Sequence, residues 1–181
     1  AERGGRITFA TDSYTGNLKT DGDENSHIRT TILKSMRGDA LGHVGMKLGA
    51  KASWEGSASS LTDLTLGNDS VWHVGRAGDI RLPVLSGSNG NIHMNRGGGD
   101  LSVGSLEGKA GFSFERDAAD ATRILGGTVI IDKAAAGSIV TIFTDRTGLE
   151  SAEEAVMQKV LRGLAEKLYY KGYMNGEEHI T

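Results

Sequence analysis

The stretch DLSVGSLEGKAGFSF, residues 100 to 114, decides how this chain is expected to fold. Apolar residues alternate with polar ones in both halves of the stretch, and the turn-forming segment LEGKAG separates the halves. Because successive side chains of a β-strand point to opposite faces, a period of two predicts half-buried strands. Similar short runs recur from Arg6 to Phe143 with glycine and asparagine between them, so this region is expected to be all-β.

The composition narrows the class of protein further. Glycine makes up 27 of the 181 residues, about twice the usual share, whereas proline occurs once, at Pro83. Many glycines with little proline favour tight turns between regular elements over a disordered linker. The formal net charge of -3 and the lack of a lysine or arginine run argue against a nucleic-acid or anionic-membrane partner.

The absence of cysteine removes another group of functions. Without any cysteine the chain has no disulfides, no thiolate zinc site and no thiol nucleophile, and it suits passage through an oxidising compartment. No apolar run reaches the length of a membrane span, and the polar start AERGGR is not a signal peptide. We therefore expect any targeting segment to lie outside this sequence.

A loose repeat in the positions of large apolar residues points to one all-β architecture. Trp72 follows Trp54 at nearly the same interval at which Ile92 and Met94 follow Trp72 and Val74. A drifting repeat of this kind favours a solenoid of stacked coils over a β-sandwich. Corner candidates are Asn68, Asn89, Asn91 and Asn95. The expected inward set is Trp54, Trp72, Val74, Leu82, Leu85, Ile92, Met94, Leu101, Val103, Leu106, Phe112 and Phe114.

The end of the sequence changes its periodicity. Ser151 followed by Glu154 has the form of a capping box, and Gly172 has the form of a helix stop. Between them, apolar residues recur at helical spacing and predict an amphipathic helix over 151–172 that docks on the β region. After Asn175-Gly176 the pattern returns to strand over 173–181, where we expect a boundary within a longer chain.

Three segments together resemble a known family. They are NDSVWHV (68–74), GDIRLPVLSGSNGNIHM (78–94) and GGGDLSVGSLEGKAGFSFERDAADATRILGGTVIIDKAAAGSIVTIFTD (97–145). Their succession resembles the passenger region of Gram-negative autotransporters, the exported proteins of type V secretion. The resemblance covers Leu61 to Asp145 and departs from the family at Pro83 and Ala110, whereas residues 1–60 match loosely. The closing AEKLYYKGYMNGEEHIT (165–181) is similar to a helix-plus-strand unit of long passengers.

This resemblance implies a fold and a function. The fold would be all-β, a right-handed parallel β-helix over 1–148 with one C-terminal amphipathic α-helix. The function would be that of a non-enzymatic adhesin or structural stalk at the cell surface or secreted, with a role in virulence. Residues Leu101 to Phe143 would act as a folding nucleus in secretion. Expected partners are the outer-membrane β-barrel of the same polypeptide and a host surface receptor or a second copy, and no cofactor or metal is expected.

Three carboxylates support an alternative class. Polysaccharide lyases and hydrolases built on β-helices use clustered carboxylates, and Asp63, Asp79 and Asp100 recur at intervals close to one repeat. That spacing could place them on neighbouring coils of a carbohydrate-active enzyme. Solvated turn carboxylates, which protect strand edges, explain the same residues more simply.

Two further features are candidate binding sites. If Trp72 and Ile92 point inward, His73 and His93 point outward on adjacent coils, where they could hold a metal ion or haem or could be ordinary surface residues. The triplet Arg37-Gly38-Asp39 is the tripeptide that host integrins recognise, and it also fits an ordinary loop. Nucleophile-elbow, P-loop and dinucleotide-binding motifs are absent.

Overall fold

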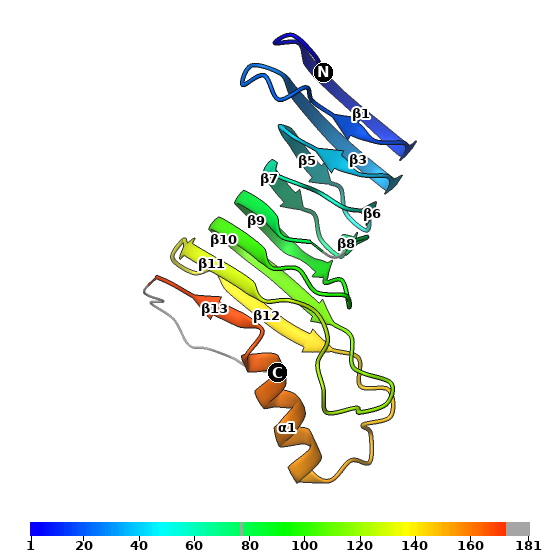
Figure 1. Cartoon of the computed structure of the whole chain (residues 1–181), viewed down its shortest axis with the longest axis vertical. Coiled ribbons are helices and arrows are strands. Elements are labelled where there is room, and N and C mark those ends of the chain that lie inside the picture. The colour runs from blue at the N-terminus through cyan, green and yellow to red at the C-terminus, as the bar shows by residue number, and fades with distance from the viewer. Residues whose placement is uncertain (77, 173–181) are drawn as a thin grey trace.

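The computed structural model describes residues 1–76 and 78–172, and it is predominantly β with one helix in those ranges. This confirms the expected strand-rich composition (Figure 1). The strands are β1 (Arg6–Thr15), β2 (Leu18–Lys19), β3 (His27–Arg37), β4 (Ala40–Leu41), β5 (Val44–Leu48), β6 (Ser53–Gly56), β7 (Leu61–Leu66), β8 (Val71–Val74), β9 (Ile80–His93), β10 (Leu101–Phe114), β11 (Val129–Ala134), β12 (Ile139–Thr144) and β13 (Leu168–Tyr170). The helix is α1 (Glu154–Ala165).

The pairings of the strands correct the expected architecture. The strands of the main sheet pair in parallel, and β3 pairs with both β5 and β6 while β9 pairs with both β7 and β8. The order β3-β5-β7-β9-β8-β6 therefore closes on itself. The prediction of a right-handed parallel β-helix is wrong, because the main sheet is a closed six-strand parallel barrel with extra strands.

The sequence repeat could not reveal this closure. Paired residues such as Ile28 and Val44, or Ser13 and Ser35, lie roughly one repeat apart in the sequence. The repeat therefore gives the distance along the chain to the next parallel neighbour, whichever architecture contains it. The topology is decided by β3 and β9, because each of these long strands pairs with one strand along its first half and with another along its second half. The spacing of residues in the sequence does not indicate this change of partner.

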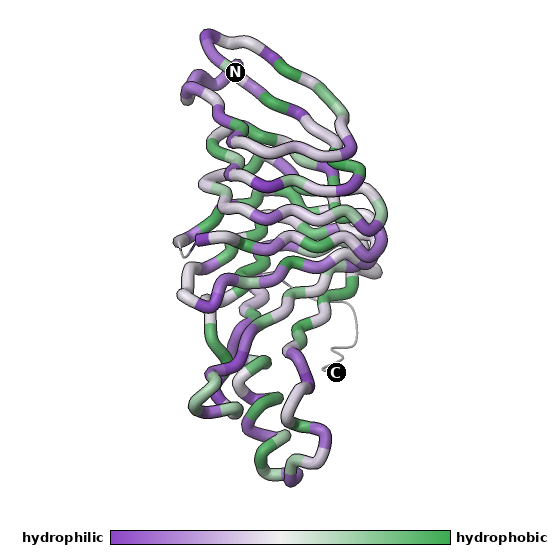
Figure 2. The backbone as a smooth tube through the Cα atoms, turned by 90° about the vertical axis from the view of Figure 1, so that its right-hand side faces the viewer, coloured by the Kyte–Doolittle hydropathy of each residue, from purple (hydrophilic) through white to green (hydrophobic). Residues whose placement is uncertain are grey.

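Register shifts interrupt three of the strand pairings, β1 with β3, β5 with β7 and β9 with β10, yet core side chains still form continuous rows. One row has an aromatic centre and runs through seven strands: Tyr14, Met36, Trp54, Trp72, Ile92, Phe112 and Ile142. A second row is mostly aliphatic: Phe9, Thr30, Met46, Leu64, Leu85, Leu106 and Ala134. Figure 2 shows successive passes of the chain side by side, with hydrophobic and hydrophilic residues alternating along them.

The predicted core residues are confirmed with one exception. All of the expected inward set are buried except Val74, which is half-buried and packs against the core. Of the asparagines expected at corners, Asn89 has the left-handed backbone that a corner requires, with a φ of 71°. Asn89 and Asn91 both lie within β9, whereas Asn68 and Asn95 lie between strands as expected. Period-two patterning was therefore a better guide to burial than to corners.

The N-terminal end of the sheet is left uncovered. β1 pairs with β3 on one side, and no strand of the described residues pairs with its other side. Its apolar residue Ile7 is 46% exposed, whereas its row neighbour Ile28 is 3% exposed. The core is therefore complete from β3 onward and open at β1.

The helix is shorter than the sequence predicted. It covers Glu154–Ala165, its N-cap is Glu153, and no side chain caps it, so the expected capping box does not form. Leu168–Tyr170 form β13 and pair with β11 instead of continuing the helix to 172. The aromatic pair in this segment favours a strand, and an open edge of β11 is available to it. The strand predicted over 173–181 lies outside the described residues.

We predict that Trp72→Ala destabilises the protein by about 3–5 kcal/mol, because it removes a fully buried side chain from the middle of a continuous row. The free energy of unfolding in urea measures this loss. The matched control is Tyr169→Ala, which truncates an aromatic side chain that is 58% exposed and should change stability by less than about 0.5 kcal/mol. Equal losses in the two variants would contradict the row packing.

Candidate functional site

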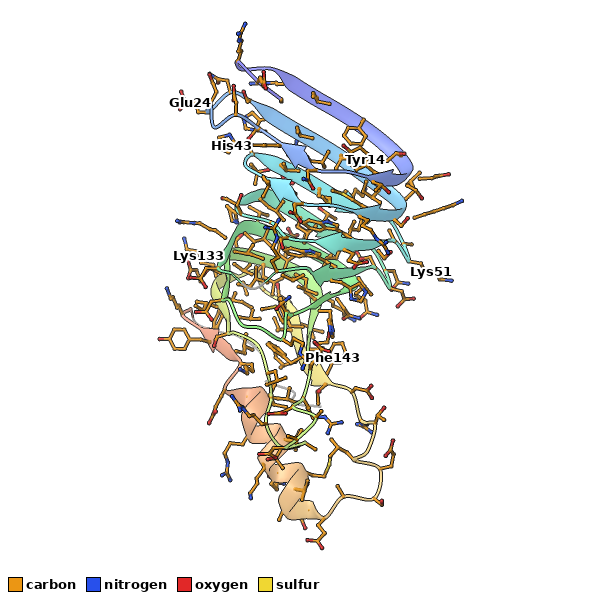
Figure 3. All side chains as sticks on the ribbon, turned by 45° about the vertical axis from the view of Figure 1, so that its right-hand side comes forward. Tyr14, Glu24, His43, Lys51, Lys133 and Phe143 are labelled. Atoms are coloured by element: carbon orange, nitrogen blue, oxygen red, sulfur yellow. The ribbon has the colours of Figure 1, made fainter. Side chains whose placement is uncertain are left out.

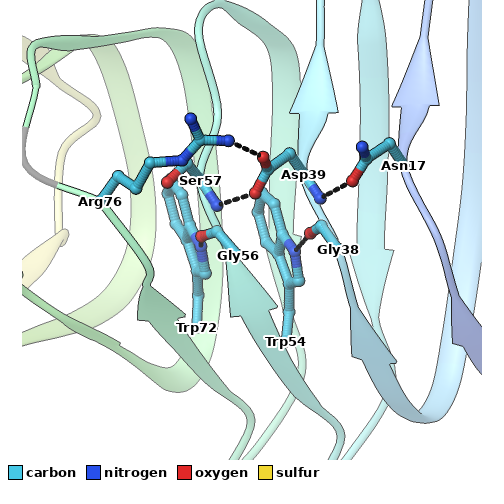
Figure 4. Close-up of polar contacts among 8 residues, drawn as sticks. All are labelled: Asn17, Gly38, Asp39, Trp54, Gly56, Ser57, Trp72 and Arg76. Atoms are coloured by element: carbon cyan, nitrogen blue, oxygen red, sulfur yellow. Dashed lines mark hydrogen bonds and ion pairs between the residues drawn. The ribbon is translucent and has the colours of Figure 1, made fainter.

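Arg37 is the last residue of β3, and Gly38 and Asp39 form the two-residue corner between β3 and β4 (Figure 4). The backbone N–H of Asp39 donates to Asn17 Oδ1 at 2.9 Å, and Asp39 Oδ1 accepts from the backbone N–H of Ser57 at 2.9 Å. Asp39 Oδ2 also forms an ion pair with Arg76. Asp39 therefore joins its own corner to the corners at Asn17, Ser57 and Arg76.

Indole groups support the same corner from inside. Trp54 Nε1–H donates to the carbonyl oxygen of Gly38 at 2.9 Å, and Trp72 Nε1–H donates to that of Gly56 at 2.9 Å. The two rings are stacked with centroids 4.3 Å apart and an interplanar angle of 6° (Figure 4). Each buried indole thus has its hydrogen-bond partner, and each partner is a corner glycine.

These contacts bear on integrin recognition. Such recognition needs an aspartate that is free to reach a metal ion, but the Asp39 side chain is 15% exposed and holds Ser57 and Arg76. Arg37 is exposed and lies 3.4 Å from Glu55 in an ion pair. The structure therefore presents the triplet as a structural corner whose carboxylate is already engaged.

Replacing Asp39 should change the pH dependence of stability. The Ser57 N–H, and then Arg76, hold the pKa of Asp39 below its ordinary 3.8. A lowered pKa stabilises the folded state above the ordinary value, and this contribution is lost as pH falls through the lowered one. We predict that Asp39→Asn costs about 1–3 kcal/mol at pH 7 and that the difference from the parent narrows below about pH 4.

Urea unfolding at pH 7 and pH 3 measures that difference. Asp69→Asn is the control, because Asp69 is exposed and its left-handed backbone, with a φ of 59°, also suits asparagine. This control should leave stability nearly unchanged at both pH values. A cost of Asp39→Asn that stays constant from pH 7 to pH 3 would contradict the role of the ionised carboxylate.

The corner also requires glycine at particular positions. A Cβ on Gly56 would lie 1.9 Å from the carbonyl oxygen of Gly38, so the two backbones can approach only without a side chain. We predict that Gly56→Ala destabilises the protein by several kcal/mol, on the order of a strongly overpacked core. Gly49→Ala is the control, since its Cβ would meet its nearest atom at an ordinary 3.4 Å. Similar thermal unfolding of the two variants would contradict this account.

The three carboxylates of the candidate enzyme site are not gathered in one place. Asp63 forms an ion pair with Arg29, with 2.9 Å between Nη2 and Oδ2. Asp79 Oδ1 accepts from the backbone N–H of Asp100 at 2.9 Å, and Asp100 Oδ1 accepts from that of Thr128 at 2.8 Å. Asp79 and Asp100 thus link successive turns in the manner of Asp39, and Asp63 lies elsewhere on the sheet.

The structure brings His73 and His93 together. They are paired residues of β8 and β9, with ring centroids 5.5 Å apart at 56°. Across residues 1–76 and 78–172, no three histidine, aspartate or glutamate side chains gather into a group that could hold a metal ion. The pair therefore stands as an outward aromatic contact, and its role as a ligand pair stays a prediction.

A groove opens where this histidine row ends. It has a volume of about 580 Å³ and lies between the ends of β10 and β12 and the loops that follow them. His93 Nδ1 is 2.8 Å from Ser113 Oγ, within hydrogen-bond distance, and His93 Nε2 is 3.9 Å from Glu115 Oε2. Phe143, at the end of β12 (Figure 3), lines the same groove.

Arg116 fixes the two loops that form the outer wall of this groove. Its Nη1–H donates to the carbonyl of Ala121 at 3.3 Å, and its Nη2–H donates to those of Asp145 at 2.9 Å and Thr147 at 2.6 Å. Its Nε is buried with no hydrogen-bond partner among the described residues. The Thr147 hydroxyl and backbone N–H donate to Asp145 and lower the pKa of that carboxyl. The outer wall is thus held by its own hydrogen bonds.

The sequence pattern singles out two residues that line this groove, His93 as outward and Phe114 as part of the core. His93 was identified as outward, and the same alternation places Ser113 and Glu115 outward because Phe112 and Phe114 point inward. The missing information was the register of β9 on β10, which pairs His93 with Ser113. The contribution of Arg116 depends on loop conformation and has no signal in the pattern.

Comparisons with known proteins leave the family open. The chain has no significant match to a protein-family model, a curated protein or a solved structure. No helix in the part of the chain that the structure describes is both long and apolar enough to cross a bilayer.

Proposed function

We propose that this chain is a non-enzymatic, surface-exposed segment that serves as a structural stalk or adhesin, as its resemblance to autotransporter passengers implies. The observation that supports this proposal most is the continuity of register through parallel strands from β1 to β12. Such continuity gives a stiff element whose length is set by the number of strands. A stalk needs this property.

Stiffness follows from what each strand contributes to its neighbours. Parallel pairing joins adjacent strands through backbone hydrogen bonds, while the core rows join them through side-chain packing. The corner hydrogen bonds of Asp39 and of Asp79 with Asp100 add a third connection at the edges. Bending the molecule between two strands would break all three kinds of contact at once.

The charged outer surface of the sheet is suited to exposure to solvent. Ion pairs between neighbouring strands cover it, among them Lys34 with Asp12 at 3.7 Å and Arg37 with Glu55 at 3.4 Å. Such exposed pairs add little stability, but mixed charges on the outer face reduce nonspecific strand association. The absence of cysteine further suits export, since no misplaced disulfide can form on the way.

One strand suits the expected role as a folding nucleus. β10 pairs with β9 along most of its length, with β11 through Leu101–Leu106 and with β12 through Lys109–Phe114. A strand with three partners can template the elements on both sides of it. This supports the proposal that residues Leu101 to Phe143 fold early and guide the rest.

The proposal predicts that intact cells expose the protein. Antibody staining of unbroken source cells and its loss after external protease treatment measure exposure, and a periplasmic protein serves as the control for intact membranes. An immunoblot of the outer-membrane fraction should show a polypeptide larger than 19.1 kDa. Staining that requires lysis, with the band in the soluble fraction, would overturn the surface role.

A further inference from the structure

The groove beside His93 has the size of a small-ligand site. Its volume of about 580 Å³ falls within the range of about 300–1,000 Å³ that small-molecule sites occupy. Its inner wall comes from the paired ends of β9, β10 and β12, and its outer wall from loops that Arg116 holds in place. Because hydrogen bonds hold both the strand ends and the loops in place, the groove exists in the fold without a bound ligand.

One side of the groove is aromatic. Phe143 is half-buried at the end of β12, and its Cε1 lies 3.1 Å from where a Cβ on Gly111 would be. Because Gly111 has no side chain, the Phe143 ring can lie close to the surface of β10. The rest of the ring contributes to the groove, where it offers an apolar surface for a ligand to stack on.

The charged groups of the outer wall are already engaged. Three of the five N–H groups of Arg116 donate to backbone carbonyls and its Nε is buried, which leaves one Nη1–H for an anionic ligand. Asp145 accepts from Thr147, and Asp117 accepts from the backbone N–H of Ala119 and lies 3.6 Å from Arg123. An anionic ligand, or a cation that binds Asp117 or Asp145, would have to displace these contacts.

The polar groups with remaining capacity lie on the inner wall. Glu115 is 42% exposed, and its carboxylate is too far from His93 Nε2, at 3.9 Å, for a hydrogen bond. Ser113 and His93 share one hydrogen bond and each retain further donor or acceptor capacity. The free set is therefore a carboxylate, an imidazole and a hydroxyl next to an aromatic ring.

We propose that this groove binds a neutral saccharide. A pyranose ring has an edge of hydroxyl groups and a face of C–H groups, which match the polar set and Phe143 respectively. The Glu115 carboxylate would accept from ligand hydroxyls in charge-assisted hydrogen bonds, while Ser113 and His93 would donate to or accept from the neighbouring hydroxyls. This inference rests on the proposed surface role and deepens it by naming the class of receptor that the protein would contact.

Saturation-transfer NMR on the purified full chain tests this proposal. The probes are glucose, galactose, mannose, N-acetylglucosamine and disaccharides of each, with spermidine and methyl phosphate as charged probes whose C–H protons the method detects. We expect at least one saccharide to bind in the millimolar range and the charged probes to give no comparable signal. Binding of spermidine or methyl phosphate alone, or of no probe, would overturn the proposal.

Matched variants locate the binding. Phe143→Ala and Glu115→Gln should each weaken saccharide binding about tenfold or more. Tyr169→Ala and Glu107→Gln are their controls, because they remove an exposed aromatic ring on β13 and an exposed carboxylate on β10 outside the groove. Thermal unfolding establishes that each variant folds, and Glu115→Gln keeps the side-chain shape.

The outcomes separate this inference from the proposed function. Binding that persists in both groove variants would place the ligand elsewhere and overturn the groove assignment. Because the experiment uses purified protein, a negative result leaves the surface-labelling result unaffected. Conversely, saccharide binding by a protein found only inside the cell would support the groove and overturn the surface role.

Discussion

The fold depends on parallel strands that stay in register with their neighbours. Register places like side chains in one row, so a buried position on one strand fixes a buried position on the next. The row from Tyr14 to Ile142 shows the result, because it carries both tryptophans and keeps the interior apolar through seven strands. The shifts at Thr11/Ser13, Val44/Gly45 and Lys109/Ala110 are absorbed locally, whereas a slip of one residue along a whole strand would turn polar side chains into this interior.

The corners set the register that the rows then use. The backbones at Gly38 and Gly56 approach more closely than any side chain would allow. Next to Gly38, Asp39 is hydrogen-bonded to the preceding corner at Asn17 and to the following corner at Ser57. The register of each strand on the next is thus fixed at the corner by hydrogen bonds and glycine contacts. Along the length of the strands it is fixed by side-chain packing. The same constraint brings His93 level with Ser113 and so creates the inner wall of the groove.

The sequence predicts much of this interior and little of its topology. Alternation identified the buried side chains correctly, apart from Val74, because burial depends on a local period of two. It missed the closed path of strands, since β3 and β9 each use two halves for different partners. It also placed the end of α1 too late, because pairing of Leu168 with Val129 is a nonlocal gain. His73 and His93 were brought together as their spacing predicted, whereas the loops that Arg116 clasps left no periodic signal.

The stacked indoles give the molecule an optical property. The chain has two tryptophans, and both are fully buried, parallel within 6° and 4.3 Å apart. Because both rings are shielded from water, their fluorescence emission in the native protein lies at shorter wavelength than that of a solvated indole. The emission therefore reports on the packing of β6 against β8 without any added label, and it shifts to longer wavelength when water reaches the two rings.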